Sequence, residues 1–192
     1  MAQPAFFVYW QIRSSCPICS AAVLFAPSYS VAAHMKNYEF VTIWRVKAPI
    51  ESVWNEIYQS KQWPAWWKGV ESVLEMRKGD EAGVGSIHRY TWKSKLPYRL
   101  SFDMEMIRIE PPRLLEGIAK GELQGRGLWQ LSSEDSETIV RYDWSVETTK
   151  RWMNLLAPLA RPLFEWNHNV VMSWGAKGLA ERLGASVVEE KT

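Results

Sequence analysis

Residues Arg161–Leu183 read RPLFEWNHNVVMSWGAKGLAERL and form the last long stretch of the chain in which apolar side chains recur at helical spacing. Leu163, Trp166, Val170 and Trp174 follow one another at intervals of three or four residues, which places them on one side of an α-helix. A helix with so broad an apolar face needs another layer of structure to cover it. The stretch therefore predicts a long C-terminal helix around which the rest of the domain is arranged.

Two polar residues, Asn167 and His168, interrupt the apolar face of this helix. A buried amide or imidazole needs a hydrogen-bond partner or a water molecule, because an unmade hydrogen bond costs free energy. The pair therefore either closes a satisfied polar spot in the core or lines a cavity.

Length and composition favour a single globular domain. A chain of 192 residues can bury about two thirds of its unfolded surface and needs no disulfide bonds. The formal net charge is +2, from 23 Lys and Arg against 21 Asp and Glu, so the sequence does not predict a nucleic-acid partner. Twelve Trp against six Phe is a heavy loading of large rings, which fill a core or face a bound ligand.

The cysteines restrict the chemistry of the domain. Cys16 and Cys19 are the only two and lie near the N-terminus, so neither a disulfide framework nor a cysteine nucleophile is expected in the domain. The pair would supply half of a zinc site, but no second pair exists and His34 alone cannot complete four ligands. The sequence predicts no metal and no cofactor.

Residues 1–34 differ in composition from the rest of the chain. Arg13 is their only formally charged side chain, and prolines and serines interrupt each apolar run. Because Met35 stands just before the first predicted strand, we interpret residues 1–34 as a leader, either an over-long start or a disordered extension. The alternative is a secretory signal over residues 1–33, although Arg13 is far from the start. A cytoplasmic location is expected by default, and export if the signal is genuine.

The middle of the chain predicts strands joined by tight turns. Apolar and polar side chains alternate in Tyr38–Lys47, and two short helices follow, one opened by Pro49 and one around Pro64. The separators that follow are short and rich in turn residues, so neighbouring strands should be antiparallel; the glycines of Gly121–Gly127 indicate a hairpin turn. Six further strands are expected at Val70–Arg77, Gly85–Lys93, Tyr98–Ile109, Arg113–Lys120, Gly127–Ser133 and Thr138–Thr148.

This order of elements indicates an α+β domain over residues 35–185, followed by a polar tail at residues 186–192. A seven-stranded antiparallel sheet twists and curls, so it should close around the C-terminal helix and leave a hollow between them. We expect this hollow to be a mostly apolar ligand pocket. Its expected lining residues are Trp44, Trp54, Trp66, Tyr90, Trp92, Phe102, Met104, Trp129, Tyr142, Trp144, Asn167, His168, Val171 and Trp174.

Five segments carry a resemblance to a known superfamily. They are WRVKAPIESVWNEI (44–57), WPAWWKGV (63–70), VGSIHRYTWKSKLPYRLSFDMEMIRIEPPRLLEG (84–117), RYDWSV (141–146) and WMNLLAPLARPLFEWNHNVVMSWGAKGLAERL (152–183). Residues Tyr38–Leu183 resemble the SRPBCC (START-like) superfamily, in its polyketide cyclase/dehydrase and lipid-transport branch. The resemblance implies a helix-grip fold whose internal cavity receives lipids, polyketides or other apolar small molecules. It brings no universal catalytic residues, so the site residues above are inferred from pattern alone.

Three functions are compatible with these features. We favour a carrier or binding protein for an apolar small molecule, a lipid or a polyketide-like ring system. The alternative is a metal-free enzyme of the cyclase or dehydratase type, in which His168 acts as acid or base while Asn167 and Tyr142 hold a carbonyl or enolate oxygen. The third is a non-catalytic interaction module whose cavity is filled by its own Trp side chains. The sequence makes no prediction of the oligomeric state.

Two further groups near the expected pocket have alternative interpretations. His88 should point inward with Tyr90 and Trp92, which would leave Arg89 in solvent. The second group, a set of tryptophans and leucines, has two interpretations. It could form a gate that touches a membrane transiently, or it could pack the short helices against the sheet, which is the simpler interpretation. This group consists of Trp63, Trp66 and Trp67, with Leu155, Leu156 and Leu159 opposite.

Overall fold

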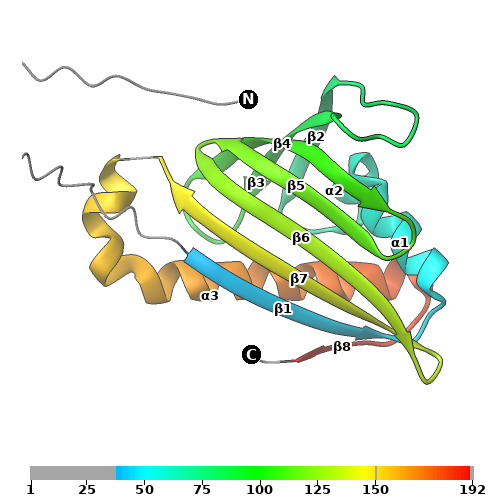
Figure 1. Ribbon diagram of the computed structural model, residues 1–192. Helices are drawn as coiled ribbons and strands as arrows, with labels where there is room; N and C mark the ends of the chain where they lie inside the picture. The colour runs from blue at the N-terminus through cyan, green and yellow to red at the C-terminus, as the bar shows by residue number, and fades with distance from the viewer. Residues whose placement is uncertain (1–37, 150, 191–192) are drawn as a thin grey trace, which may run out of the picture. The chain divides into compact units, whose positions relative to one another are not determined.

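An eight-stranded antiparallel sheet curves around one long helix, α3 (Figure 1). The computed structural model describes residues 38–149 and 151–190, and all of them belong to the unit Met35–Thr192. The predicted leader, residues 1–34, lies outside the described residues. No helix in the described ranges is long and apolar enough to span a membrane. The predicted α+β class and helix-grip architecture are confirmed.

The elements follow the predicted order. They are β1 (Tyr38–Val46), α1 (Ile50–Tyr58), the 3-10 turn η1 (Ser60–Gln62), α2 (Trp63–Trp66), β2 (Val70–Arg77), β3 (Ile87–Lys93), β4 (Arg99–Glu110), β5 (Leu114–Gly121), β6 (Leu123–Glu134), β7 (Glu137–Thr148), α3 (Arg151–Leu183) and β8 (Val187–Glu190). The strands lie in the order β2-β3-β4-β5-β6-β7-β1-β8. The short helices α1 and α2 lie together at one end of the sheet (Figure 1).

Helix α3 begins earlier than the sequence predicts. It runs from Arg151 rather than from Arg161, and so includes both Pro158 and Pro162. Each proline removes one backbone N–H donor and favours a kink, and the ribbon of α3 bends sharply near its N-terminal end (Figure 1). The prolines therefore bend the helix without ending it.

The C-terminal strand β8 is the main departure from the predicted topology. The sequence predicts seven strands and a polar tail at residues 186–192, but Val187–Glu190 pairs with β1 and makes an eighth strand. Gly184 ends α3 in a left-handed conformation with φ of 59°, which turns the chain back toward the sheet. The amide of Lys47 then donates to the carbonyl of Ser186 at 3.0 Å. Four residues carry too short a pattern to predict this pairing.

Small residues on β5 and β6 leave space on the concave face of the sheet. Of the glycines predicted to mark a hairpin turn, Gly121 ends β5 beside the turn, whereas Gly125 and Gly127 lie within β6, because only Glu122 separates the two strands. Gly117 is paired with Gly127 across the two strands, and Ala119 with Gly125. These positions place no side chain larger than a methyl group on the concave face, which leaves room there for the side chains of Met104 and Trp144 and for a cavity.

The convex face of the sheet carries matched charges. Arg89 binds Asp103 through two hydrogen bonds of 2.7 and 2.8 Å, directly across β3 and β4. Glu105 accepts hydrogen bonds from Arg77 at 2.7 Å and from Lys120 at 2.9 Å. Because these ion pairs are partly exposed, each contributes little to stability.

Candidate ligand-binding site

Two neighbouring cavities lie on the concave face of the sheet, the first between the sheet, α2 and α3, and the second between the sheet and the short helices. The first has a volume of about 160 Å³ and lies against the middle of α3. Its walls come from the start of β1, the end of β3, the adjoining ends of β4, β6 and β7, and the segment Phe164–Met172 of α3. It is therefore assembled from segments that are far apart in the sequence.

Four buried polar atoms of the first cavity have no hydrogen-bond partner among the described residues. They are the Tyr38 hydroxyl, Trp92 Nε1, Asn167 Oδ1 and His168 Nε2. Leaving a buried polar group unpaired costs about 1–3 kcal/mol, so such groups are normally satisfied by protein, water or ligand. The cavity thus combines an aromatic lining with several polar atoms that require partners.

His168 is held on the inner side of α3 by an aromatic contact. Its ring stacks on Phe40 of β1 with centroids 4.2 Å apart and an angle of 13° between the planes. Burial lowers the pKa of His168 from 6.5 to about 4. The imidazole is therefore neutral at physiological pH, with one nitrogen as donor and the other as acceptor.

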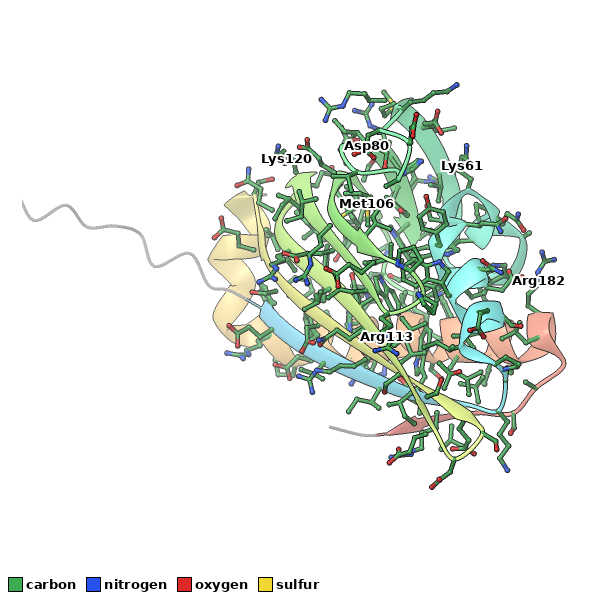
Figure 2. The ribbon with its side chains drawn as sticks, turned by 45° about the vertical axis from the view of Figure 1, so that its right-hand side comes forward. Lys61, Asp80, Met106, Arg113, Lys120 and Arg182 are labelled. Carbon is green, nitrogen blue, oxygen red and sulfur yellow. The ribbon has the colours of Figure 1, made fainter. Side chains whose placement is uncertain are left out.

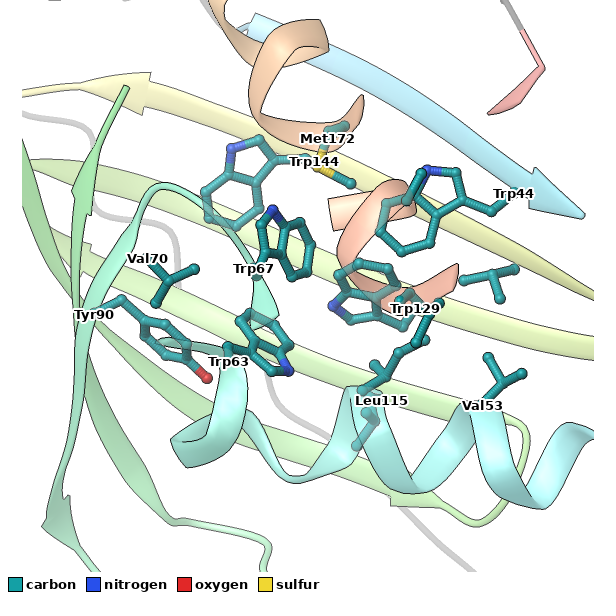
Figure 3. Close-up of a cluster of buried hydrophobic side chains, with 14 of the residues drawn as sticks. Trp44, Val53, Trp63, Trp67, Val70, Tyr90, Leu115, Trp129, Trp144 and Met172 are labelled. Atoms are coloured by element: carbon teal, nitrogen blue, oxygen red, sulfur yellow. The ribbon is translucent and has the colours of Figure 1, made fainter. Parts of the chain in front are cut away.

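Five aromatic side chains line both cavities and so stand between them; we call them the aromatic wall. They are Trp63, Trp92, Phe102, Trp129 and Tyr142. Tyr142 stacks on Trp129 at 4.0 Å, and Trp63 lies 6.2 Å from Trp129 and 6.4 Å from Trp92. Figure 3 shows Trp63 and Trp129 within the buried cluster beside Trp67. Burial also raises the pKa of Tyr142 well above 10, so its hydroxyl stays protonated.

The second cavity lies on the other side of the aromatic wall and is larger, at about 570 Å³. Its floor includes Met104 and Met106 of β4 above the glycine pair of β5 and β6. Its rim is polar: Lys61 and Asp80 belong to it, and both lie at the same end of the molecule (Figure 2). Lys61 donates a hydrogen bond of 2.9 Å to Glu75.

His88 lies in the second cavity, as its alternation with Tyr90 and Trp92 predicts. Arg89 faces outward to Asp103, so the predicted inward register of β3 is confirmed. Burial lowers the pKa of His88, whereas Glu75, with a carboxylate oxygen 3.8 Å from Nε2, opposes that shift.

The structure brings ten of the fourteen expected lining residues to the two cavities. Tyr90 and Met104 line only the second. Eight line the first: Trp92, Phe102, Trp129, Tyr142, Trp144, Asn167, His168 and Val171.

The remaining four expected residues line neither cavity, because they pack against other side chains. Trp44 is fully buried behind Trp67 and Trp129. Trp54 stacks on Tyr58, Trp66 stacks on Trp67, and Trp174 lies beneath Lys68.

Among the cavity residues not expected from the sequence are Trp63 of α2, Trp67 just after it, and Tyr38 and Phe40 of β1. Trp63 and Trp67 are four residues apart, and Trp66 is three residues from Trp63, so helical spacing places both Trp66 and Trp67 near Trp63 and does not separate them. Tyr38 and Phe40 share the alternation of Trp44 along β1, which was a usable signal for the start of that strand.

The short helix α2 is attached to α3 rather than forming an exposed gate. Trp63 and Trp67 are 7% and 1% exposed. Trp67 Nε1 donates to the carbonyl of Val171 at 2.9 Å, and Trp63 Nε1 donates to that of Glu56 at 3.1 Å. The gate hypothesis is therefore wrong for these two indoles; the side chains of residues 155, 156 and 159 lie outside the described residues.

Comparison with known proteins places this architecture in a family. Residues 46–171, about two thirds of the chain, match the family described as polyketide cyclase/dehydrase and lipid transport. The chain has no significant match among curated protein sequences.

Several solved structures share the fold. TTHA0849 from Thermus thermophilus aligns with 21% identity and a TM-score of 0.62, over 76% of this chain and 97% of that chain. The Zhui aromatase/cyclase from Streptomyces sp. R1128 has 13% identity and a TM-score of 0.60, over 79% and 94%. A START superfamily protein from Mycobacterium smegmatis has 11% identity and a TM-score of 0.61, over 77% and 97%. Identities this low establish the fold alone. From the family match and this fold together, the chain belongs to the polyketide cyclase/dehydrase and lipid transport family of the SRPBCC (START-like) superfamily.

Proposed function

We propose that this protein binds a small ring-containing molecule with a hydroxyl or carbonyl group in the first cavity, as a carrier or binding protein. The observation that carries the proposal is the set of four unpaired polar atoms within an aromatic lining. A purely apolar ligand would leave those atoms unpaired, whereas a phenol or ketone would pair with one or more of them.

The size of the first cavity suits one ring. An apolar cavity of about 150 Å³ is known to accept benzene, and the first cavity is about 160 Å³. A ligand with several rings would have to pass the aromatic wall to use the space of the second cavity. Each buried methylene contributes about 0.8 kcal/mol, so apolar contact supplies affinity and the polar atoms supply selectivity.

Binding is favoured over acid-base catalysis by the state of His168. General acid-base catalysis works best when the pKa of the catalytic group lies near the working pH. Burial lowers the pKa of His168 to about 4, and among the described residues no carboxylate contributes to that shift. At neutral pH the imidazole is therefore a poor proton donor and a weak base, but it remains a good hydrogen-bond partner.

The test compares p-cresol with p-xylene, which differ by a hydroxyl in place of a methyl group. In titration calorimetry with the full chain, p-cresol should bind about 5–10-fold more tightly, the effect of one net hydrogen bond. Replacing His168→Phe and Asn167→Leu together should remove this preference. Asn169→Ala, an exposed substitution on the same helix, should retain it. Equal affinity of the unaltered protein for both compounds, or no binding of either, would contradict the proposal.

A further inference from the structure

The outer side of α3 carries an exposed apolar strip. Leu163 and Trp166 are 46% and 45% exposed and lie one turn apart. Trp174 is partly exposed two turns further along the same side. In the described part of the chain, the other large exposed apolar side chains lie on α1, β2, β4 and β8, and none of these is a tryptophan.

Lysines from other elements reach over this strip. Lys68, just after α2, places Nζ 4.8 Å from the centre of the Trp174 ring. Lys95, in the loop between β3 and β4, places Nζ 5.7 Å from the Trp166 ring. Both distances suit a cation-π contact. We define the α3 patch as Leu163, Trp166, Trp174, Lys68 and Lys95, together with Lys177 on the next turn.

The lysines of the α3 patch outnumber the carboxylates beside it, of which Glu181, exposed one turn beyond Lys177, is unpaired among the described residues. Within the described ranges, neither Lys68, Lys95 nor Lys177 has an ion-pair partner. The neighbouring charges of α3, Arg161 and Glu165, pair with each other at 2.9 Å. On the convex face of the sheet, in contrast, arginines are matched by acidic side chains. The patch therefore combines net positive charge with exposed indole and leucine side chains.

This combination fits the boundary between lipid and water. Tryptophan favours the headgroup level of a bilayer, and each lysine near an anionic membrane contributes about 1 kcal/mol of binding free energy, equivalent to about a fivefold change in affinity. An acidic soluble partner would match the charge but would not require the exposed leucine and indole. From this charge complementarity we propose that the α3 patch binds the surface of an anionic lipid bilayer.

The α3 patch adjoins the first cavity. Asn167 of the cavity lining directly follows Trp166 in sequence, Phe164 lies two residues before it, and Ser94 of the lining precedes Lys95. A bilayer on the patch would therefore lie beside the residues that surround the first cavity. If the first cavity holds a ligand, a bilayer in this position could exchange it. That role rests on the proposed function, whereas the binding of the bilayer itself does not.

The experiment is sedimentation of the full chain with vesicles of phosphatidylcholine, with and without phosphatidylglycerol. The protein should sediment preferentially with the anionic vesicles, and added salt should weaken this binding. Replacing Lys68→Gln or Lys95→Gln should each reduce the partition coefficient about fivefold. Trp166→Ala should also reduce it, and this loss should persist at high salt. Residues 1–34 are present in every variant, so any contribution from them cancels in the comparison.

Matched controls use exposed residues outside the patch. Lys47→Gln removes a lysine that also has no ion pair in the described structure, and Leu74→Ala removes a side chain that is 57% exposed on β2. Both variants should partition as the unaltered protein does. The proposal is overturned by equal partitioning onto neutral and anionic vesicles, or by patch variants that partition normally. It is equally overturned if the patch variants lose binding to a single-stranded oligonucleotide but not to vesicles. Titration of the same variants with p-cresol tests cavity binding separately, so that a failure of membrane binding and a failure of cavity binding are seen in different measurements.

Discussion

His168 shows how one buried side chain couples the stability of the domain to its ligand site. The ring lies against Phe40, and burial lowers its pKa from 6.5 to about 4. The unfolded chain therefore takes up a proton on this residue at a pH where the folded chain does not. The domain keeps the ring neutral at a cost in acid stability, and thereby keeps an uncharged hydrogen-bonding group in the cavity.

The first prediction concerns the pH dependence of unfolding. Between pH 6.5 and about 4 the unfolded state binds more protons at His168 than the folded state, so stability should fall as the pH falls through this range. Above pH 6.5 His168 is neutral in both states and does not lower the free energy of unfolding. Near pH 4 the loss of that free energy is at most about 3 kcal/mol. Urea unfolding of the unaltered protein and of His168→Phe should diverge by this amount from pH 7 to pH 4.

The variant is needed because carboxylates also destabilise the fold at low pH. Hydrogen bonds from basic partners lower the pKa values of Asp103 and Glu105. Protonation of these carboxylates in acid therefore lowers the free energy of unfolding of both proteins alike. The difference between the two proteins isolates His168. An NMR titration that places its pKa near 6.5 in the folded chain would show that the ring is solvated and the argument is wrong.

At the scale of elements, two glycines allow α3 to approach α2 closely. A methyl group at Gly175 would overlap the ring of Trp67, and one at Gly178 would overlap the backbone carbonyl of Trp66. A side chain can rotate away from such an overlap, but a backbone carbonyl cannot do so without moving its helix. Gly178 therefore determines how closely the two helices pack.

The second prediction follows from this close approach. Alanine is favoured over glycine in a helix by about 1 kcal/mol, but overpacking costs about 1–3 kcal/mol and the overlap at Gly178 is with backbone. Gly178→Ala should therefore lower the free energy of unfolding by about 1–2 kcal/mol. Thermal unfolding measures the loss, with Asn169→Ala as an exposed control on the same helix that should melt unchanged. A more stable Gly178→Ala variant would mean that the helices are further apart than described.

At the scale of the whole molecule, two features shape the interior: small residues leave space in it, and large rings divide that space. The inner positions of β5 and β6 are too small to fill the curve of the sheet, as the Gly117 and Gly127 pair shows. The indoles of α2 and β6 extend into the same space from opposite sides and divide it. The interior is therefore neither one large pocket nor a filled core, and it holds two cavities separated by the aromatic wall.

The third prediction tests whether the aromatic wall limits ligand length. Phe102 lines both cavities and stacks at 5.8 Å on Tyr90, so Phe102→Ala should open a passage between them. The substitution should cost about 3–5 kcal/mol of stability. In calorimetry, the affinity for 4-phenylphenol relative to p-cresol should rise in this variant. Phe164→Ala, which enlarges the first cavity alone, should raise that ratio less. An unchanged ratio in Phe102→Ala would show that the wall does not control access.

Much of the fold was predictable from local pattern. The alternation along β1, the short turn-rich separators between the later strands and the helical spacing of α3 are signals that neighbouring residues carry, and they led to the correct class and order of elements. The strand β8 was not predictable, because its pairing with β1 depends on the turn at Gly184 bringing it to the sheet edge. The glycines of β6 were misread as turn residues, because glycine opposite glycine across a ladder has no local signature.

For the site, the sequence by itself determined the supply of residues: many indoles, an inward Asn167 and His168, and strands whose inner faces are apolar. Only the tertiary structure decided that Trp63 and Trp67 line the first cavity while Trp44 is covered, and that Tyr38 joins His168 there. The physical reason is the range of the forces involved. Periodicity reports the direction of a side chain from its own backbone, whereas a cavity wall depends on van der Waals contacts between segments far apart in sequence.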